Sequence, residues 1–327
     1  MKSLLEKDSL YVWHPFTQAA TAPKPLEVVS ADGPYLQLAD GRRILDVISS
    51  WWTNLHGHSH PKIAKAIGAQ AAQLDHVIFA GCTHPLAVEL AQKIIEIAPQ
   101  GLSRVFYSDN GSTSVEVGLK MAFQYWQNKN RPQKKEFVSL EHAYHGDTIG
   151  AMSVGDPNEF VAPFRPLLFD VHHVPTPDAL HTEEACIQKL ASLLEHRASH
   201  IAAMIVEPMV QGAGGMRIQS PRFLKSVAEL CRKHNVLLIA DEVMTGFGRT
   251  GTMFACEHAA ISPDILCIAK GLTGGVIPLA ATIATEELYD AFWSEDVHRA
   301  FLHGHSFTAN PITCAAALAS LELLEEN

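Results

Sequence analysis

The sequence lacks the features of a membrane or nucleic-acid-binding protein. No apolar run among its 327 residues reaches the roughly 18 residues that a membrane-spanning helix needs, and the N-terminus has no apolar signal-peptide core. Basic residues are few, because 25 Lys and Arg stand against 35 Asp and Glu, and they form no cluster. A formal net charge of −10 argues against nucleic acid and anionic membranes as partners. We therefore expect a cytoplasmic protein.

Cysteine is also scarce. The six cysteines form no C-x-x-C pair, and most lie in apolar runs. They are typical of small buried residues in a reducing compartment, not of a disulfide framework. The sequence has no internal repeat and no low-complexity stretch. A composition of 47% hydrophobic and 18% charged residues predicts a globular protein of one large domain or two smaller ones.

Hydrophobic patterning predicts two kinds of structure. The first 50 residues contain three short apolar stretches separated by Asp-Gly turns, which predicts a small antiparallel sheet. After residue 60, helical patterns alternate with unbroken Val, Ile and Leu runs, which are typical of strands buried on both faces. The clearest of these runs are residues 201–206, 236–240 and 265–269. We predict an α/β fold with a mainly parallel central sheet flanked by helices, and a ligand site beyond the carboxyl ends of the strands.

Polar residues of complementary chemistry follow the three runs. Glu207 follows the first, Asp241 the second and Lys270 the third. Pyridoxal phosphate needs a lysine that forms a Schiff base and an anion against its ring nitrogen, so that the ring acts as an electron sink. Lys270 and Asp241 are the candidates for these two roles. The alternative is a structural ion pair at the edge of the sheet.

A candidate phosphate site lies at residues 110–114. The sequence Asn-Gly-Ser-Thr-Ser follows a predicted strand and opens a helix. Backbone N–H groups, hydroxyl groups and the positive end of a helix dipole bind anions well. Ordinary helix capping by Ser112 or Thr113 is the alternative.

Three other motifs have competing interpretations. Residues 246–251 read G-x-G-x-x-G, but five residues separate them from the preceding strand and no clear helix follows, which disfavours a dinucleotide site. The histidines of residues 56–60 lack a carboxylate or cysteine that would complete a metal site, so a structural role is favoured. Trp51 and Trp52 could line an apolar substrate channel, and core packing of at least one of them is the alternative.

Two longer stretches carry a family resemblance. VLLIADEVMTGFGRTGTMFACEH at 236–258 and PDILCIAKGLTGG at 263–275 resemble the class III aminotransferases, which have fold type I. The resemblance extends over essentially the whole chain. It implies a pyridoxal 5'-phosphate enzyme with a large cofactor-binding domain and a small α+β domain.

Four further motifs resemble one branch of this family. They are WHPFTQ at 13–18, SSWWTNLHGHSHP at 49–61, AYHGDTIGAMSVGD at 143–156 and EPMVQGAGGM at 207–216. This branch converts 8-amino-7-oxononanoate to 7,8-diaminononanoate in biotin biosynthesis. Other members of the family act on ornithine or 4-aminobutyrate, and aminomutases and decarboxylases share the cofactor. A protein that binds the cofactor without turnover is the alternative outside catalysis.

The resemblance implies roles for particular residues. Lys270, Tyr144 and Asp147 are expected to be catalytic. The residues expected to bind the cofactor are Gly111, Ser112, Tyr144, Glu207, Asp241, Lys270, His305 and Ser306. Those expected to bind substrate are Phe16, Trp51, Trp52, Tyr144, Arg249, Lys270 and Gly304. His305 and Ser306 are expected to reach the cofactor of a neighbouring subunit, which implies a homodimer with shared active sites.

The amino donor and the chain boundaries are further expectations. Phe16 and His305 replace the Tyr and Pro of relatives that use S-adenosylmethionine and resemble relatives that use lysine. The Trp51-Trp52 pair favours S-adenosylmethionine, which we expect to be the donor, with lysine the alternative. Residues 1–50 are expected to begin the small domain, 51–312 to form the large domain and 313–327 to begin a C-terminal segment. We expect the chain to be a fragment that lacks the rest of the small domain and an arginine for the substrate carboxylate.

Overall fold

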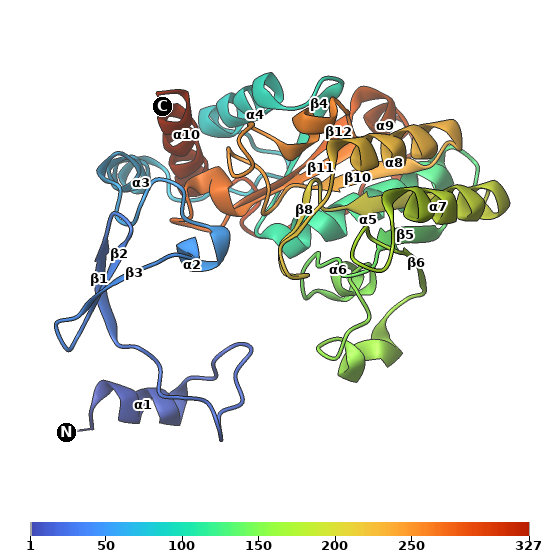
Figure 1. The fold of residues 1–327 in the computed structure, drawn as a ribbon. Coiled ribbons are helices and arrows are strands. Elements are labelled where there is room, and N and C mark those ends of the chain that lie inside the picture. The colour runs from blue at the N-terminus through green and yellow to red at the C-terminus, as the bar shows by residue number, and fades with distance from the viewer. Residues whose placement is uncertain (1, 327) are drawn as a thin grey trace.

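The computed structural model describes residues 2–326. Its central sheet consists of β4 (Leu102–Ser108), β5 (Glu136–Leu140), β6 (Val171–Val174), β7 (Ile201–Val206), β10 (Leu237–Asp241), β11 (Ile265–Ile268) and β12 (Ala280–Thr285). The strand order is β4-β12-β11-β10-β7-β5-β6. Only β12 is antiparallel to its neighbours β11 and β4. The predicted α/β fold with a mainly parallel sheet is thus confirmed (Figure 1).

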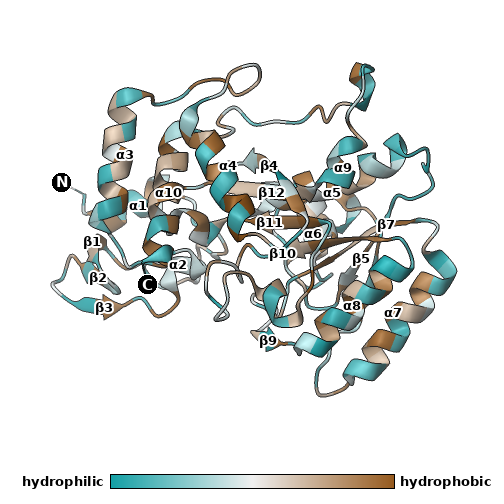
Figure 2. Cartoon of the chain, turned by 90° about the horizontal axis from the view of Figure 1, so that it is seen from above, coloured by the Kyte–Doolittle hydropathy of each residue, from teal (hydrophilic) through white to brown (hydrophobic). Residues whose placement is uncertain are grey.

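Helices cover both faces of this sheet. On one face lies α5 (Gly111–Asn128), and on the other lie α4 (Pro85–Ile97), α7 (Glu183–Arg197) and α8 (Pro221–Lys233). Successive side chains of a strand point to opposite faces, so Ala203 and Ile205 of β7 pack with α5, while Met204 and Val206 pack on the other side. Figure 2 shows these strands as the most hydrophobic part of the molecule. Burial on both faces explains their unbroken apolar runs.

The N-terminal part forms a separate small sheet. Strands β1 (Val28–Asp32), β2 (Tyr35–Leu38) and β3 (Arg43–Leu45) pair antiparallel in this order, which confirms the sequence prediction. Gly33 has a φ of +53° at the turn between the first two strands, a conformation that glycine adopts readily. Helix α1 (Leu4–Tyr11) extends away from the body of the molecule (Figure 1). The proposed domain boundaries remain a prediction.

The remaining elements complete the described chain. They are α2 (Ser49–Trp52), α3 (Pro61–Gln73), α6 (Ile149–Ser153), η1 (Ala162–Leu167), β8 (Val210–Gln211), β9 (Arg217–Ile218), η2 (Ala255–Ala259), η3 (Lys270–Thr273), α9 (Glu286–Asp290), η4 (Val297–Arg299) and α10 (Pro311–Glu325). The η elements are 3-10 helices. Helix α10 packs against α3, α4 and η3. No helix within residues 2–326 has the length and apolar character needed to cross a membrane.

Candidate active site

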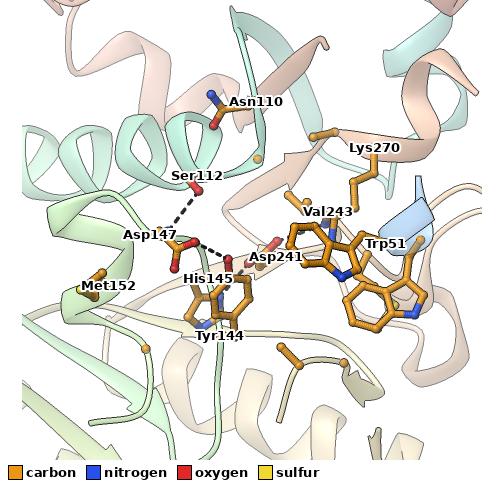
Figure 3. A pocket seen from close by; sticks show the side chains of 18 of the residues that line it. Trp51, Asn110, Ser112, Tyr144, His145, Asp147, Met152, Asp241, Val243 and Lys270 are labelled. Carbon is orange, nitrogen blue, oxygen red and sulfur yellow. Dashed lines mark hydrogen bonds and ion pairs between the residues drawn. The ribbon is translucent and has the colours of Figure 1, made fainter. Parts of the chain in front are cut away.

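A cavity of about 1310 Å³ opens at the carboxyl ends of the parallel strands. Its wall receives Asn110 after β4, Tyr144 after β5, Glu207 after β7, Asp241 at the end of β10 and Lys270 after β11. Five strands of the sheet therefore deliver polar side chains to one cavity. Figure 3 labels Asn110, Tyr144, Asp241 and Lys270 among them. This is where a ligand is expected in an open α/β sheet.

Lys270 begins the 3-10 helix η3 in an unusual backbone conformation. Its φ is +43°, in the left-handed region that costs energy for a residue with a side chain. Burial lowers the pKa of the ammonium group, while Asp241 and Glu207 act in the opposite direction. The Nζ atom lies 5.1 Å from the centre of the Trp52 ring. The lysine is thus held inside the cavity, with its charged form disfavoured by burial.

Asp241 is the last residue of β10 and is almost fully buried. Its Oδ2 lies 2.7 Å from His145 Nδ1, and its Oδ1 accepts the N–H of Val243 at 3.1 Å. A carboxylate only accepts, so the contact requires a proton on His145 Nδ1. His145 Nε2 is buried and has no partner among the described residues. His145 was not predicted from the sequence. The only sequence feature that indicates a role for it is its position beside Tyr144 in the AYHGD motif.

The candidate phosphate site lies at the N-terminus of α5. The cap of this helix is Asn110, whose side chain accepts the N–H of Thr113, while Thr113 Oγ1 accepts the N–H of Asn110. Ser112 takes no part in the cap, so capping explains Thr113 but not Ser112. A Cβ at Gly111 would lie 2.6 Å from Val243 Cγ1, so glycine is needed for this close approach. Gly111 and Ser112 both line the cavity beside the N–H groups of the first helical turn.

Tyr144 and Asp147 form a hydrogen-bonded pair in the cavity wall next to Ser112. Tyr144 donates its hydroxyl proton to Asp147 Oδ2 at 3.1 Å, and the N–H of Asp147 points to Ser112 Oγ at 3.3 Å (Figure 3). The N–H of Tyr144 donates to Glu207 Oε1, and that of Gly212 donates to Glu207 Oε2, both at 3.0 Å. Glu207 therefore joins two wall segments, and burial raises its pKa to about 7.

The apolar end of the cavity is formed by aromatic residues. Trp51, Trp52 and Phe16 all line it. Phe16 lies edge-on to Trp51, with ring centroids 5.5 Å apart. Trp51 is 53% exposed, so the alternative of core packing is wrong for this residue. The exposed pair of Phe16 and Trp51, together with the half-buried Trp52 beside Lys270, fits a wall that contacts a substrate chain.

Arg249 does not line this cavity in the described chain. Its Nη2 donates to the backbone carbonyl groups of Trp52 at 3.1 Å and Asn54 at 3.3 Å. Burial lowers the pKa of its guanidinium group. Arg249 thus supports the C-terminal end of α2, which carries the tryptophans, and its expected contact with substrate remains a prediction.

Gly304, His305 and Ser306 also lie outside the lining of the cavity, as far as the structure describes the chain. His305 Nδ1 is 3.6 Å from Oδ2 of Asp109, the residue just before the candidate phosphate site. Their expected contacts with a cofactor, across a subunit boundary, remain predictions.

The histidines of residues 56–60 and the G-x-G-x-x-G stretch of residues 246–251 suggested a metal and a dinucleotide, but their geometry fits neither ligand. His58 Nε2 lies 2.9 Å from Asp46 Oδ2, whereas His56 Nε2 lies 3.0 Å from Ser320 Oγ, so the two rings serve different partners. Residues 246–251 form turns, and no α-helix begins there. The geometry that a dinucleotide fingerprint requires is absent from this stretch.

Comparisons with known proteins agree with this arrangement. Residues 17–327 match the model of the class III aminotransferase family. A protein of Synechococcus elongatus named adenosylmethionine-8-amino-7-oxononanoate aminotransferase is 54% identical over 319 residues, which cover 96% of this chain and 75% of the relative. A Geobacter sulfurreducens protein of the same name is 47% identical over 341 residues, which cover 100% and 75%.

Solved structures show the same likeness. The crystal structure of adenosylmethionine-8-amino-7-oxononanoate aminotransferase from Methanocaldococcus jannaschii has a TM-score of 0.94 and 40% identity, and the match covers 99% of this chain and 74% of that chain. An amine transaminase from an uncultivated Pseudomonas species, described as PLP-bound, has a TM-score of 0.90 and 36% identity, with 97% and 74% covered.

Proposed function

Because this chain belongs to the class III aminotransferases, we propose that it converts 8-amino-7-oxononanoate to 7,8-diaminononanoate in biotin biosynthesis. The family depends on pyridoxal 5'-phosphate. The observation that carries the proposal is the convergence of Lys270, Asp241 and the start of α5 on one cavity with an aromatic end.

The side chains around the cavity fit pyridoxal phosphate. Lys270 offers a primary amine for the aldehyde, Asp241 an anion for the ring nitrogen, and Gly111 with Ser112 a helix N-terminus for the phosphate. His145 supports this assignment, because its contact fixes the orientation of the Asp241 carboxylate. When bound, the cofactor supplies an electron sink that stabilises negative charge at the substrate carbon.

The residues of the chain then have distinct tasks. Lys270 Nζ acts as the general base that takes a proton from the substrate carbon and returns it, and burial aids this by favouring the neutral amine. Asp241 provides a fixed negative charge. The hydroxyl of Tyr144 and the carboxylate of Asp147 orient the reacting end of the substrate.

The acceptor carries a long aliphatic chain, and the cavity offers an apolar surface for it. Besides the tryptophans, Ile149, Met152, Phe160 and Phe164 line the cavity. Phe160 is 77% exposed, so it offers free apolar area to a ligand. Burial of such area is favourable by about 25 cal/mol per Å².

We propose S-adenosylmethionine as the amino donor, with lysine the alternative. The names of the relatives support the first. Phe16 lies in the cavity wall, and the family resemblance implies that users of S-adenosylmethionine and users of lysine differ at this position. Because Phe16 has no hydroxyl, donor recognition here relies on its edge-on contact with Trp51 and on apolar area.

The decisive measurement is the donor half-reaction. We expect S-adenosylmethionine, added alone to the cofactor-loaded protein, to remove the visible absorbance of the bound cofactor. The absorbance should return when 8-amino-7-oxononanoate is added. The Lys270→Ala variant should show neither the initial absorbance nor turnover, because no other lysine lines the cavity in the described residues.

Other outcomes identify the rival functions. A response to lysine alone would retain the reaction and change the donor. A response only to ornithine or 4-aminobutyrate would contradict the proposed substrate. Cofactor binding without a response to any amine would indicate a protein that binds but does not turn over.

The assembly and location of the enzyme belong to the same proposal. Gly304, His305 and Ser306 lie outside the cavity of their own chain, which supports a homodimer in which these residues serve the partner's site. A cytoplasmic location is supported by six cysteines that form no disulfide. Cell fractionation followed by immunodetection tests the location.

A further inference from the structure

Residues 144–152 form one wall of the cavity, and we call them the 144–152 segment. They follow β5 as a loop and enter helix α6. Tyr144, Asp147, Ile149 and Met152 all line the cavity from this segment. The shape of the substrate-facing wall therefore depends on what holds the segment against the rest of the molecule.

Helix α5 holds the segment with two acceptor side chains. Ser112 Oγ is 3.3 Å from the backbone nitrogen of Asp147. Glu116 Oε1 accepts the N–H groups of both Gly150, at 2.6 Å, and Ala151, at 3.1 Å. Ser112 and Glu116 are four residues apart and thus lie on the same face of α5. The segment is fixed at two successive turns of one helix.

Two glycines of the segment match these two acceptors. A Cβ at Gly146 would lie 2.1 Å from Ser112 Oγ, and a Cβ at Gly150 would lie 2.2 Å from Glu116 Oε2. A side chain at position 146 would also meet the backbone Cα of Ser112 at 2.9 Å and push the segment away from α5, whereas a side chain at position 150 would displace the Glu116 carboxylate from its N–H donors. Each glycine therefore faces one of the two acceptors. This match indicates that the close approach at Glu116 is a specific feature of the site.

Glu116 acts from outside the cavity. It is absent from the lining of the cavity in the described chain, and it lines a separate surface depression together with Lys120 and Phe169. It therefore cannot touch a substrate, whereas Ser112 lies in the cavity wall itself. Its carboxylate instead accepts from the first N–H groups of α6, which need partners from outside the helix.

We propose that Glu116 is a positioning residue that fixes the substrate-facing side of the 144–152 segment and thereby sets recognition of the amino acceptor. The identity of that acceptor rests on the proposed function. Cofactor binding depends mainly on Lys270, Asp241 and the start of α5, so loss of Glu116 affects the acceptor more than the cofactor. Small displacements of positioning groups reduce catalysis strongly, because reacting atoms must meet at defined distances.

Hydrogen exchange in the cofactor-free protein tests the contact directly. Glu116→Ala should accelerate exchange in peptides that cover residues 144–153 by about tenfold, because two N–H groups lose their acceptor. Glu116→Gln should stay within about twofold of the wild type, since one amide oxygen can replace Oε1, which accepts both bonds. Glu89→Ala, on the exposed face of α4, is the matched control and should change neither exchange nor kinetics.

Kinetics then test the consequence. Glu116→Ala should raise the KM for 8-amino-7-oxononanoate about five- to tenfold, while the Kd of the cofactor stays within about twofold. Gly150→Ala should have the same effect and serves if Glu116→Ala does not fold. The proposal is wrong if Glu116→Ala leaves exchange or the KM unchanged, or if Glu116→Gln is as impaired as Glu116→Ala. If the wild type does not use this acceptor, the proposed function fails, whereas the exchange result still decides whether Glu116 holds the segment.

Discussion

At the scale of single residues, Glu207 supports the cavity wall by accepting hydrogen bonds from backbone N–H groups of two loops. Its two carboxyl oxygens accept from the N–H groups of Tyr144 and Gly212, so it joins the loops that follow β5 and β7. The prediction that Glu207 contacts the cofactor has not been tested. Its hydrogen bonds indicate that it holds the backbone of Tyr144 in the cavity wall.

Glu207 should make the stability of the protein depend on pH. Burial raises its pKa from 4.5 to about 7, so between these values the folded protein binds a proton that the unfolded chain has released. Stability is therefore lost as pH rises from 4.5 to 7, by roughly 3 kcal/mol from this group. Glu207→Gln, which has no such proton, should lack this component. Thermal unfolding of both proteins without cofactor, from pH 4.5 to 8, measures the difference. If the stabilities of the wild type and Glu207→Gln changed with pH in parallel, the raised pKa of Glu207 would be contradicted.

At the scale of elements, the start of α5 depends on a glycine. Gly111→Ala places a methyl group 2.6 Å from Val243 Cγ1, and we expect a loss of about 1–3 kcal/mol of stability together with weaker cofactor binding. Gly68→Ala in α3 is the control, because nothing lies within 4 Å of its Cβ. It should be neutral or stabilising by up to about 1 kcal/mol. Chemical unfolding and cofactor titration provide the measurements.

A second variant separates crowding from other effects of the alanine. Val243→Ala in the Gly111→Ala background frees the space that the new methyl group needs and should restore cofactor binding in part. Equal binding by Gly111→Ala and wild type would show that the close approach to Val243 has no role in the phosphate site.

The sequence predicts those parts of the fold and site whose cause is local. Unbroken apolar runs predict β7, β10 and β11, and parallel strands end at the same edge, so Glu207, Asp241 and Lys270 could be placed together. Strand β12 was not predicted, because its sequence, AATIAT, contains only one of the Val, Ile and Leu residues that indicate a buried strand. The contact of His145 with Asp241 joins residues 96 positions apart, and no local pattern reports such a pair.

At the scale of the whole molecule, a dimer with shared sites predicts that defective subunits complement each other. Lys270→Ala and His305→Glu remove groups that, in the proposed dimer, serve one site from different subunits. Each variant alone should be inactive or strongly impaired. Co-expression of the two should restore about a quarter of the wild-type activity, since about half of the dimers are mixed and each has one intact site. No recovery in mixed dimers, isolated by two different affinity tags with one on each variant, would contradict shared sites.

The order of strands in the central sheet has a consequence for biosynthesis on the ribosome. Strand β4, which leads into Gly111 and Ser112, lies at one edge of the sheet and pairs with β12. Because β12 is the last strand of this sheet to be translated, β4 leaves the exit tunnel long before its partner exists. We therefore expect the nascent chain to complete the candidate phosphate end of the site only after β12 has been made. Binding of the cofactor should then be a late step in the synthesis of this sequence.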